Sequence, residues 1–134
     1  MKFVKYVWLV VALGFIGGSI GFSVISDSFQ GIVDRVSVAI KAGDSKKLSA
    51  TFAGNLSLSI KRDEGTYTKF QAELLLNDFF RANKIEQVKE LQKVNNSSNS
   101  FVVYSLKSKG VTYRVFVKFE LINRQFAVSE LRIE

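Results

Sequence analysis

The chain has 134 residues, of which 47% are hydrophobic and 23% are charged, and its formal net charge is +7. This balance is typical of a globular protein, and the length sets a ceiling of one domain. Because the sequence contains no cysteine and no histidine, it excludes disulfide bonds, thiolate nucleophiles, Cys/His zinc sites and catalysis by an imidazole. We therefore predict no catalytic residue, no metal site and no cofactor.

The first 23 residues have the organisation of a secretory signal. Lys2 and Lys5 form a short positive segment, and an apolar run follows from Val7 to Ile16, which is the order typical of signal peptides. The run falls short of the ~20 apolar residues that a membrane span usually needs. The sequence therefore favours a cleaved signal over the alternative, an uncleaved membrane anchor.

Small residues locate the cleavage site near the end of this segment. Gly21 and Ser23 stand two positions apart, as do Ser19 and Gly21, and signal peptidase requires this spacing. We predict cleavage after Ser23, with cleavage after Gly21 as the alternative. The chain then comprises a signal peptide over residues 1–23 and a single domain over residues 24–134. We expect this domain to be periplasmic or secreted, without a stable membrane anchor after cleavage.

The remaining domain is modestly basic. Loss of Lys2 and Lys5 leaves 17 basic and 12 acidic residues, a net charge of +5. The basic residues are scattered, without the aromatic-interleaved stripe of single-strand-binding proteins, so we expect no nucleic acid partner. Five basic residues lie near the first predicted strand and the third predicted helix. We expect them to form solvated surface, with an anion site as the alternative: Lys46, Lys47, Lys61, Arg62 and Lys69.

Two helices are predicted at the start of the domain. Apolar residues recur every three or four positions from Ile25 to Ile40, which is the pattern of an amphipathic helix. Gly43 marks its C-terminus. Asp44 or Ser45 is suited to cap a second, short helix, whose apolar residues would fold back on the first.

A strand and a third helix follow. Between Asn55 and Arg62, apolar residues alternate with polar ones, as in a strand with one face in water. We expect residues 63–65 to end this strand as a turn. Thr68 and Gln71 form a capping box for a helix, which continues to about Asn83. Its predicted apolar side is formed by Phe70, Leu74, Leu75 and Phe79.

The rest of the chain is predicted to form four strands in an antiparallel meander. Clusters of turn-forming residues separate these strands, at residues 95–99, 108–110 and 123–124. Between Val111 and Leu121, strict alternation predicts one packed face and one mostly polar face. Tyr113 belongs to the packed face. The opposite face carries Arg114, Phe116 and Lys118.

This order of elements predicts an α+β fold in which helices pack on the apolar face of a curved antiparallel sheet. The curvature produces a cone-like half-barrel. A domain of about 110 residues buries roughly 65% of the surface that the unfolded chain exposes, so we expect it to fold without disulfide bonds.

The predicted order of helix, Gly-Asp and short helix lies in residues 38–44, followed by Leu48 and Phe52. This opening resembles that of the nuclear transport factor 2-like superfamily. Three further motifs lie in residues 67–73 with Phe79 and Phe80, in residues 110–115 and in residues 131–134. They resemble a family of secreted bacterial proteins within that superfamily, domain of unknown function 4783. The resemblance implies the cone-like fold and export, and it implies no assigned activity.

The resemblance also implies a pocket between the third helix and the sheet, because superfamily members often have one there. We expect Tyr113 and Tyr104 to contribute to it from the sheet, and Phe70 and Leu74 from the helix. The Tyr113 hydroxyl needs a hydrogen-bond partner, which is either the backbone or water, or alternatively a ligand. With 12 Phe and 4 Tyr, the sequence favours non-catalytic binding of a small apolar molecule, or of a protein partner, in the cell envelope.

Two other functions stay open. Superfamily enzymes such as ketosteroid isomerase and scytalone dehydratase imply that a divergent isomerase or dehydratase would need a desolvated carboxylate beside a tyrosine. Glu73 and Asp78 are candidates, although we expect Asp78 to face water. The other function is a structural homodimer that packs through Arg114, Phe116 and Lys118, with a solvated sheet face as the alternative.

Overall fold

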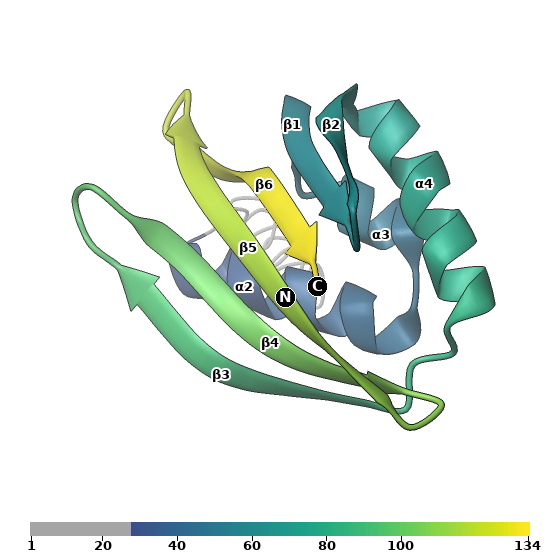
Figure 1. The fold of residues 1–134 in the computed structure, drawn as a ribbon. Helices are drawn as coiled ribbons and strands as arrows, with labels where there is room; N and C mark the ends of the chain where they lie inside the picture. The colour runs from purple at the N-terminus through teal and green to yellow at the C-terminus, as the bar shows by residue number, and fades with distance from the viewer. Residues whose placement is uncertain (1–27) are drawn as a thin grey trace, which may run out of the picture.

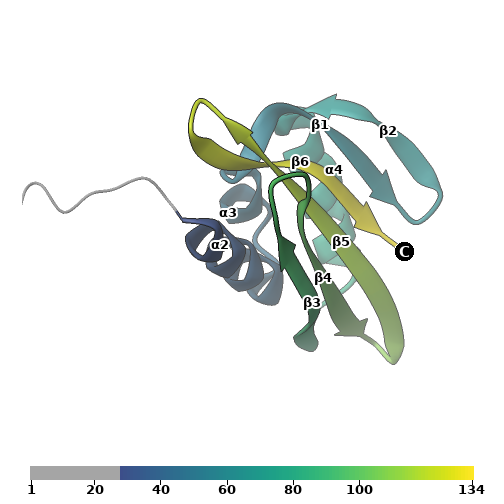
Figure 2. The ribbon, with the colours of Figure 1, turned by 90° about the vertical axis from the view of Figure 1, so that its left-hand side faces the viewer.

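The computed structural model describes residues 28–134, so the predicted signal peptide and cleavage site lie outside the described residues. Within this range the chain folds into three helices and six strands (Figures 1 and 2). The helices are α2 (Phe29–Ala42), α3 (Ser45–Ser49) and α4 (Lys69–Ala82). The strands are β1 (Phe52–Ile60), β2 (Asp63–Thr68), β3 (Gln87–Asn95), β4 (Ser100–Ser108), β5 (Val111–Ile122) and β6 (Gln125–Ile133).

The six strands form one sheet in the order β2-β1-β6-β5-β4-β3. The last four strands are an antiparallel meander, which confirms the prediction. The sheet as a whole is mixed, because β1 and β6 pair in parallel, and the prediction of a wholly antiparallel sheet is wrong at this junction. Parallel neighbours need a long crossover, and here it consists of α4 and four strands, β2, β3, β4 and β5. Alternation within a strand does not indicate which distant strand pairs with it.

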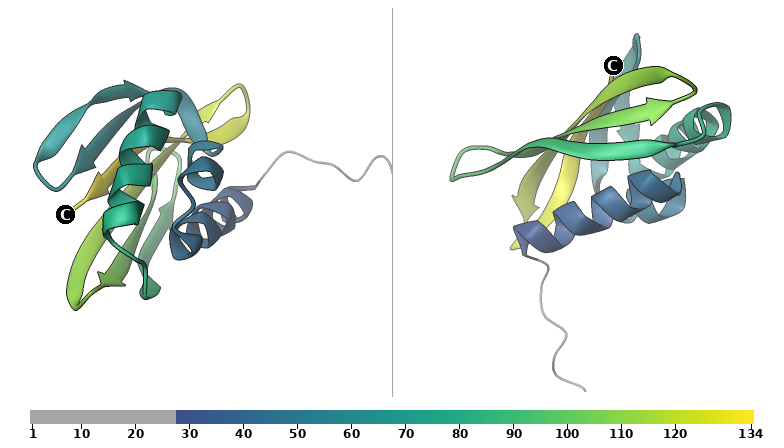
Figure 3. Two further views of the ribbon diagram at one scale, coloured as in Figure 1. Left: turned by 90° about the vertical axis from the view of Figure 1, so that its right-hand side faces the viewer. Right: turned by 90° about the horizontal axis from the view of Figure 1, so that it is seen from below.

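All three helices lie against one face of the sheet, which curves around them without closing (Figures 1 and 3). Helix α4 contacts β1 and β2, helix α2 contacts β3 and β6, and α3 contacts both other helices. This arrangement confirms the predicted α+β class and the cone-like half-barrel.

Caps define the first two helices. The Ser28 Oγ accepts a hydrogen bond of 3.0 Å from the Gly31 N–H at the start of α2. Gly43 ends α2 with a φ of 61°, a left-handed conformation that glycine adopts without a Cβ penalty. Asp44 caps α3 by accepting a 3.0 Å hydrogen bond from the Lys47 N–H. Both predicted helices are confirmed, the first from Phe29 onward.

The predicted capping box of α4 is also confirmed. The Thr68 Oγ1 accepts a hydrogen bond from the Gln71 N–H at 3.2 Å, and the Gln71 Oε1 accepts one from the Thr68 N–H at 3.1 Å. The helix ends at Ala82, with Asn83 as its C-cap.

The buried face of α4 differs from the predicted one. Phe70, Leu74 and Leu75 are 67%, 52% and 38% exposed, and the buried residues are Ala72, Leu76, Phe79 and Phe80. Both sets have helical spacing, so periodicity alone does not distinguish them. The small side chain of Ala72, which is fully buried, lets the helix backbone approach its neighbours closely.

Strand β2 was not predicted. Residues 63–65, expected as a turn, pair with β1 in an antiparallel hairpin that runs from Ile60↔Asp63 to Asn55↔Thr68. The turn is formed by the two residues between the strands, Lys61 and Arg62. Because β2 is an edge strand whose side chains are mostly exposed, it lacks the apolar alternation that identifies a half-buried strand.

The helices and the covered face of the sheet share one apolar core. The middle of β5 belongs to it, since Tyr113, Val115, Val117 and Phe119 are all buried, which confirms the predicted packed face. The ends of the predicted alternation, Val111 and Leu121, are 49% and 63% exposed, because they extend beyond the helices that cover the sheet.

Candidate functional site

The centre of the cone is filled by side chains. The gap between the helices and the middle of the sheet has no room for a water molecule. Seven apolar residues close it: Ile40, Leu48, Phe80, Leu106, Val115, Leu131 and Ile133. A central ligand pocket is therefore absent from the part of the chain that the structure describes.

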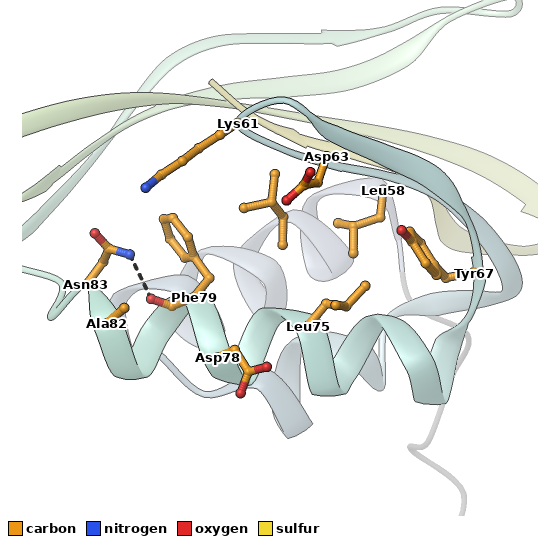
Figure 4. A pocket seen from close by; sticks show the side chains of 10 residues that line it. Leu58, Lys61, Asp63, Tyr67, Leu75, Asp78, Phe79, Ala82 and Asn83 are labelled. Atoms are coloured by element: carbon orange, nitrogen blue, oxygen red, sulfur yellow. Dashed lines mark hydrogen bonds between the residues drawn. The ribbon is translucent and has the colours of Figure 1, made fainter.

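A cleft lies to one side, between α4 and the β1–β2 hairpin (Figure 4). Its volume is about 340 Å³, which falls in the range of small-molecule sites, ~300–1,000 Å³. The hairpin contributes Leu58, Ile60, Lys61, Asp63 and Tyr67. Helix α4 and its C-cap contribute Leu75, Asp78, Phe79, Ala82 and Asn83.

Two other surface hollows have volumes of about 360 Å³ each. One lies on α2 and α3, and its lining includes the half-exposed Val38. The other lies where the β3–β4 and β5–β6 hairpins meet. Part of its polar lining is internally bonded, since the Asn96 Oδ1 accepts hydrogen bonds from the Ser98 and Asn99 N–H groups. The α4 cleft joins a buried apolar floor, Leu58 and Phe79, to the polar side chains of Lys61, Asp63 and Tyr67.

The floor of the cleft is rigidly placed. Leu58 on β1 is 1% exposed and Phe79 on α4 is 5% exposed, and both belong to the main core. The hairpin turn is tied to the last strand, because the Lys61 N–H donates a hydrogen bond of 2.6 Å to the Ile133 carbonyl. Helix and hairpin are therefore both anchored to the core on either side of the cleft.

One end of the cleft adjoins Tyr113. The Tyr113 hydroxyl donates a hydrogen bond of 3.0 Å to the Asn83 Oδ1, and the Asn83 Nδ2 donates one of 2.9 Å to the Phe79 carbonyl. The Tyr113 ring packs edge-on against Phe79 at 5.4 Å between centroids. The Lys61 Nζ lies 5.8 Å from the centre of the same ring, a distance at which cation and ring attract each other. Lys61 and Asn83 therefore meet at this end.

Three polar groups in the cleft have few partners or none. Among residues 28–134, the Asp63 carboxylate and the Tyr67 hydroxyl make no hydrogen bond or ion pair, and the Lys61 ammonium has only its contact with the Tyr113 ring. In Figure 4, Asp63 points from the hairpin into the cleft. These groups are available to a ligand without breaking an existing hydrogen bond.

Gly65 determines where the Tyr67 side chain lies. A Cβ atom at position 65 would stand 2.9 Å from the Tyr67 Oη and 3.0 Å from its Cζ, closer than real Cβ contacts. The two residues share a face of β2, being two positions apart. The missing side chain of Gly65 therefore leaves the space in which the Tyr67 ring lies along the strand at the edge of the cleft.

The two tyrosines predicted to contribute to a pocket lie outside this lining. Tyr113 is buried behind Phe79 and bonds a side chain rather than backbone or water. Tyr104 is 1% exposed, and its hydroxyl donates to the Val33 carbonyl at 3.3 Å. Burial raises the pKa of Tyr104 well above its usual value, and the negative charges of Glu90 and Asp34 raise it further. Both tyrosines belong to the core.

Phe70 and Leu74 are also placed differently from the prediction. Both point away from the sheet on the exposed side of α4, and neither lines the cleft. The residues in their place, Leu75 and Phe79, lie on the neighbouring side of the helix. No sequence pattern indicates that Tyr67 and Lys61 line a common cleft. Asp63 was predicted to lie in a turn. Lys61 and Arg62 form the two-residue turn of the hairpin. They are not the residue types that typically indicate such a turn.

The two acids predicted as candidate bases, Glu73 and Asp78, do not pair with a tyrosine. Asp78 lies at the rim of the cleft, exposed, and its carboxylate points away from the hairpin (Figure 4). Glu73 faces α3, where it accepts a hydrogen bond of 2.7 Å from the Ser49 Oγ. Glu130 lies on the outer face of the sheet, 4.0 Å from the Arg132 Nε.

The outer face of the sheet carries an apolar centre with charged surroundings. The rings of Phe101 and Phe116 lie 5.4 Å apart, and Val103, paired with Phe116, is only 3% exposed. Arg114 and Lys118 flank Phe116 along β5. The three interface candidates therefore share one face, as predicted.

Within residues 28–134, no three acidic side chains gather closely enough to hold a metal ion. No helix in the same range combines the length and the apolar character needed to cross a membrane.

Solved structures share this fold. A DUF4783 family protein from Bacteroides uniformis is 22% identical, with a TM-score of 0.72 over 75% of this chain and 94% of that one. One from Bacteroides ovatus is 23% identical, with a TM-score of 0.70 over 74% and 90%. An NTF2-like protein of unknown function from Cytophaga hutchinsonii is 8% identical, with a TM-score of 0.60 over 82% and 91%. These similarities confirm the NTF2-like fold.

None of the curated proteins matches the chain. The family model described as domain of unknown function (DUF4783) matches residues 33–134, which includes nearly all of the described domain. The chain therefore belongs to the DUF4783 family and has the NTF2-like fold.

Proposed function

We propose that the domain binds a small, largely apolar molecule in the cleft between α4 and the β1–β2 hairpin, without catalysing a reaction. The observation that carries the proposal is the pairing of a buried floor, Leu58 and Phe79, with the side chains of Lys61, Asp63 and Tyr67, which make no hydrogen bond or ion pair among residues 28–134. Small-molecule sites typically have such a composition, an apolar lining with a few convergent polar groups.

The placement of Glu73 and Asp78, the two predicted candidate bases, supports binding rather than catalysis by these residues. A general base must lie within hydrogen-bond reach of the atom that it deprotonates, and an isomerase-like site also needs a hydroxyl beside it. Asp78 points away from the hairpin, and Glu73 is engaged by Ser49. The Tyr113 hydroxyl is occupied by Asn83. These contacts favour the binding proposal over a divergent isomerase or dehydratase that uses Glu73 or Asp78 with Tyr113.

We further propose that binding takes place in the cell envelope after export. The support is the sequence of the first 23 residues alone, a positive start followed by an apolar run, and these residues lie outside the described ones.

Ligand binding is tested by NMR titration of the labelled domain with small apolar and amphipathic compounds. The expected result is a set of shifts confined to the residues of the cleft. Leu75→Trp fills the cleft, because Leu75 lines it, and should abolish these shifts. Leu74→Trp is the matched control, since Leu74 is half-exposed outside the cleft. Absence of any cleft binding, or equal loss in both variants, would contradict the proposal.

A second candidate function is supported by the outer sheet face. We propose that a second copy of the chain packs there, because Phe101 and Phe116 form a partly exposed ring pair and charges of both signs surround it, including Lys118 and Glu130. A two-fold axis places such a patch against itself, so opposite charges meet.

Sedimentation tests this dimer. Wild-type protein should sediment as a dimer and Phe116→Asp as a monomer, because the substitution places a charge in the apolar centre. Thr112→Asp is the matched control, an exposed position on the same strand and outside the ring pair, and should remain dimeric. A Phe116→Asp variant with unchanged mass, whether monomer or dimer, would refute the proposal.

A further inference from the structure

The turn of the β1–β2 hairpin presents opposite charges to one cleft. Lys61 and Asp63, two positions apart, both line it, and within residues 28–134 they form no salt bridge with each other or with another residue. Arg62, between them, does not line the cleft. A cation and an anion that face the same space without pairing favour a ligand that carries both charges.

The positive charge is held at a defined end of the cleft. The Lys61 backbone is bonded to Ile133, and its ammonium lies over the Tyr113 ring. Tyr113 in turn holds Asn83, whose Nδ2 uses one of its two N–H groups on the Phe79 carbonyl. One ammonium and one spare amide N–H therefore meet at this end. Both are donors, which is the arrangement that a carboxylate accepts.

The rest of the cleft suits an apolar group of moderate size. Leu58, Leu75 and the Tyr67 ring lie beyond Asp63, away from Lys61 and Asn83 (Figure 4). The cleft volume of about 340 Å³ has room for on the order of ten water molecules at ~30 Å³ each, which suits a side chain of moderate size.

We propose that the cleft binds an α-amino acid with a large apolar side chain. The ligand carboxylate lies against the Lys61 ammonium and the Asn83 amide, its ammonium group against the Asp63 carboxylate, and its side chain against Leu58 and Leu75. This assignment rests on the proposed function, because it names the class of ligand for the same cleft.

Three related compounds test the assignment by NMR titration: phenylalanine, phenethylamine, which lacks the carboxylate, and 3-phenylpropionate, which lacks the ammonium. Phenylalanine should bind at least about tenfold more tightly than either, because each charge-assisted hydrogen bond typically contributes about this factor. Binding of all three with equal affinity would overturn the inference and leave the proposed function standing. If none of the three compounds binds but another apolar compound occupies the cleft, the amino acid assignment is overturned and the proposed function stands. If no compound occupies the cleft, the assignment and the proposed function both fail.

Variants of the turn assign each charge. Lys61→Asn removes the ammonium, and asparagine tolerates the left-handed φ of 58° at this position. This substitution should weaken the binding of phenylalanine about tenfold and leave the affinity for phenethylamine unchanged. Asp63→Asn should weaken the binding of phenylalanine and of phenethylamine and leave the affinity for 3-phenylpropionate unchanged. Arg62→Asn is the matched control and should change none of them. Equal effects of Lys61→Asn and Arg62→Asn on 3-phenylpropionate binding, with an opposite effect of Asp63→Asn, would show that only the net charge of the turn matters, and would overturn the assignment.

Discussion

The Tyr113 hydroxyl donates a hydrogen bond of 3.0 Å to the Asn83 Oδ1 and so joins the middle of the sheet to the end of α4. Asn83 also bonds the last turn of that helix through the Phe79 carbonyl. The two bonds hold the C-terminal end of α4 at a set distance from β5. They thereby determine the width of the cleft at the end where Lys61 lies.

Tyr113→Phe should lower the free energy of unfolding by about 1 kcal/mol, the usual contribution of one hydrogen bond. Urea unfolding of Tyr113→Phe, Asn83→Ala and the double variant measures it. Because the two residues share the bond, the double variant should lose less than the sum of the single losses. Strict additivity would show that the bond contributes nothing to stability.

Gly65→Ala should displace the Tyr67 ring while leaving the fold intact. The new Cβ would stand 2.9 Å from the Tyr67 Oη, and the ring is the far end of a side chain that can rotate away. The Tyr67 ring resonances should shift, and ligand affinity in the cleft should fall. Gly54→Ala, also in the β1–β2 hairpin, is the control, because its Cβ would meet nothing within 4 Å. Unchanged Tyr67 resonances in Gly65→Ala would contradict the role given to Gly65.

Tyr104 should make the protein sensitive to alkaline pH. Its pKa is raised in the folded state by burial, whereas in the unfolded chain it titrates near its usual value of about 10. Above that pH the unfolded state loses the proton and the folded state keeps it, so stability is full below pH ~10 and falls as the pH rises further. Unfolding followed by tyrosinate absorbance should show this fall of stability with pH, and Tyr104→Phe should make the fall smaller. An equal fall in both proteins would contradict the role given to Tyr104.

Gly43→Ala should destabilise the fold by about 1–2 kcal/mol through its backbone alone, the usual penalty for a Cβ in a left-handed conformation. The added Cβ would lie 3.8 Å from atoms of Phe80 and Ile85, which is ordinary contact, so no steric clash contributes. Gly43→Asn should lose less stability than Gly43→Ala, because asparagine tolerates this conformation better. Thermal unfolding of both variants measures the difference, and a larger loss for Gly43→Asn would point to packing instead.

Replacement of Leu9 and Val10 by Asp should abolish export, because charge would interrupt the apolar run that the export machinery reads. The precursor should then stay in the cytoplasm. The wild-type protein should begin at Phe22 or Val24 when its N-terminus is sequenced. Recovery of protein that begins at Met1 from the membrane fraction would show an uncleaved anchor instead.

Local signals in the sequence were sufficient to predict most elements. The Thr68–Gln71 capping box, the Asp44 cap and Gly43 each act within one turn of chain, so their residue types alone indicate where helices begin and end. The alternation from Tyr113 to Phe119 likewise predicted the packed face of β5. Where a signal was ambiguous, as between the Phe70 and Ala72 sides of α4, the choice depended on residues distant in sequence.

The sequence by itself therefore determined the α+β class, the end of α2 and the beginnings of α3 and α4, because capping and periodicity are properties of neighbouring residues. Only the tertiary structure decided that β1 pairs with β6, that residues 63–68 form an edge strand, and that Lys61, Asp63 and Leu75 face one cleft. These outcomes follow from the way the core is filled when helices and sheet pack together. Side chains brought together by packing leave no pattern along the chain.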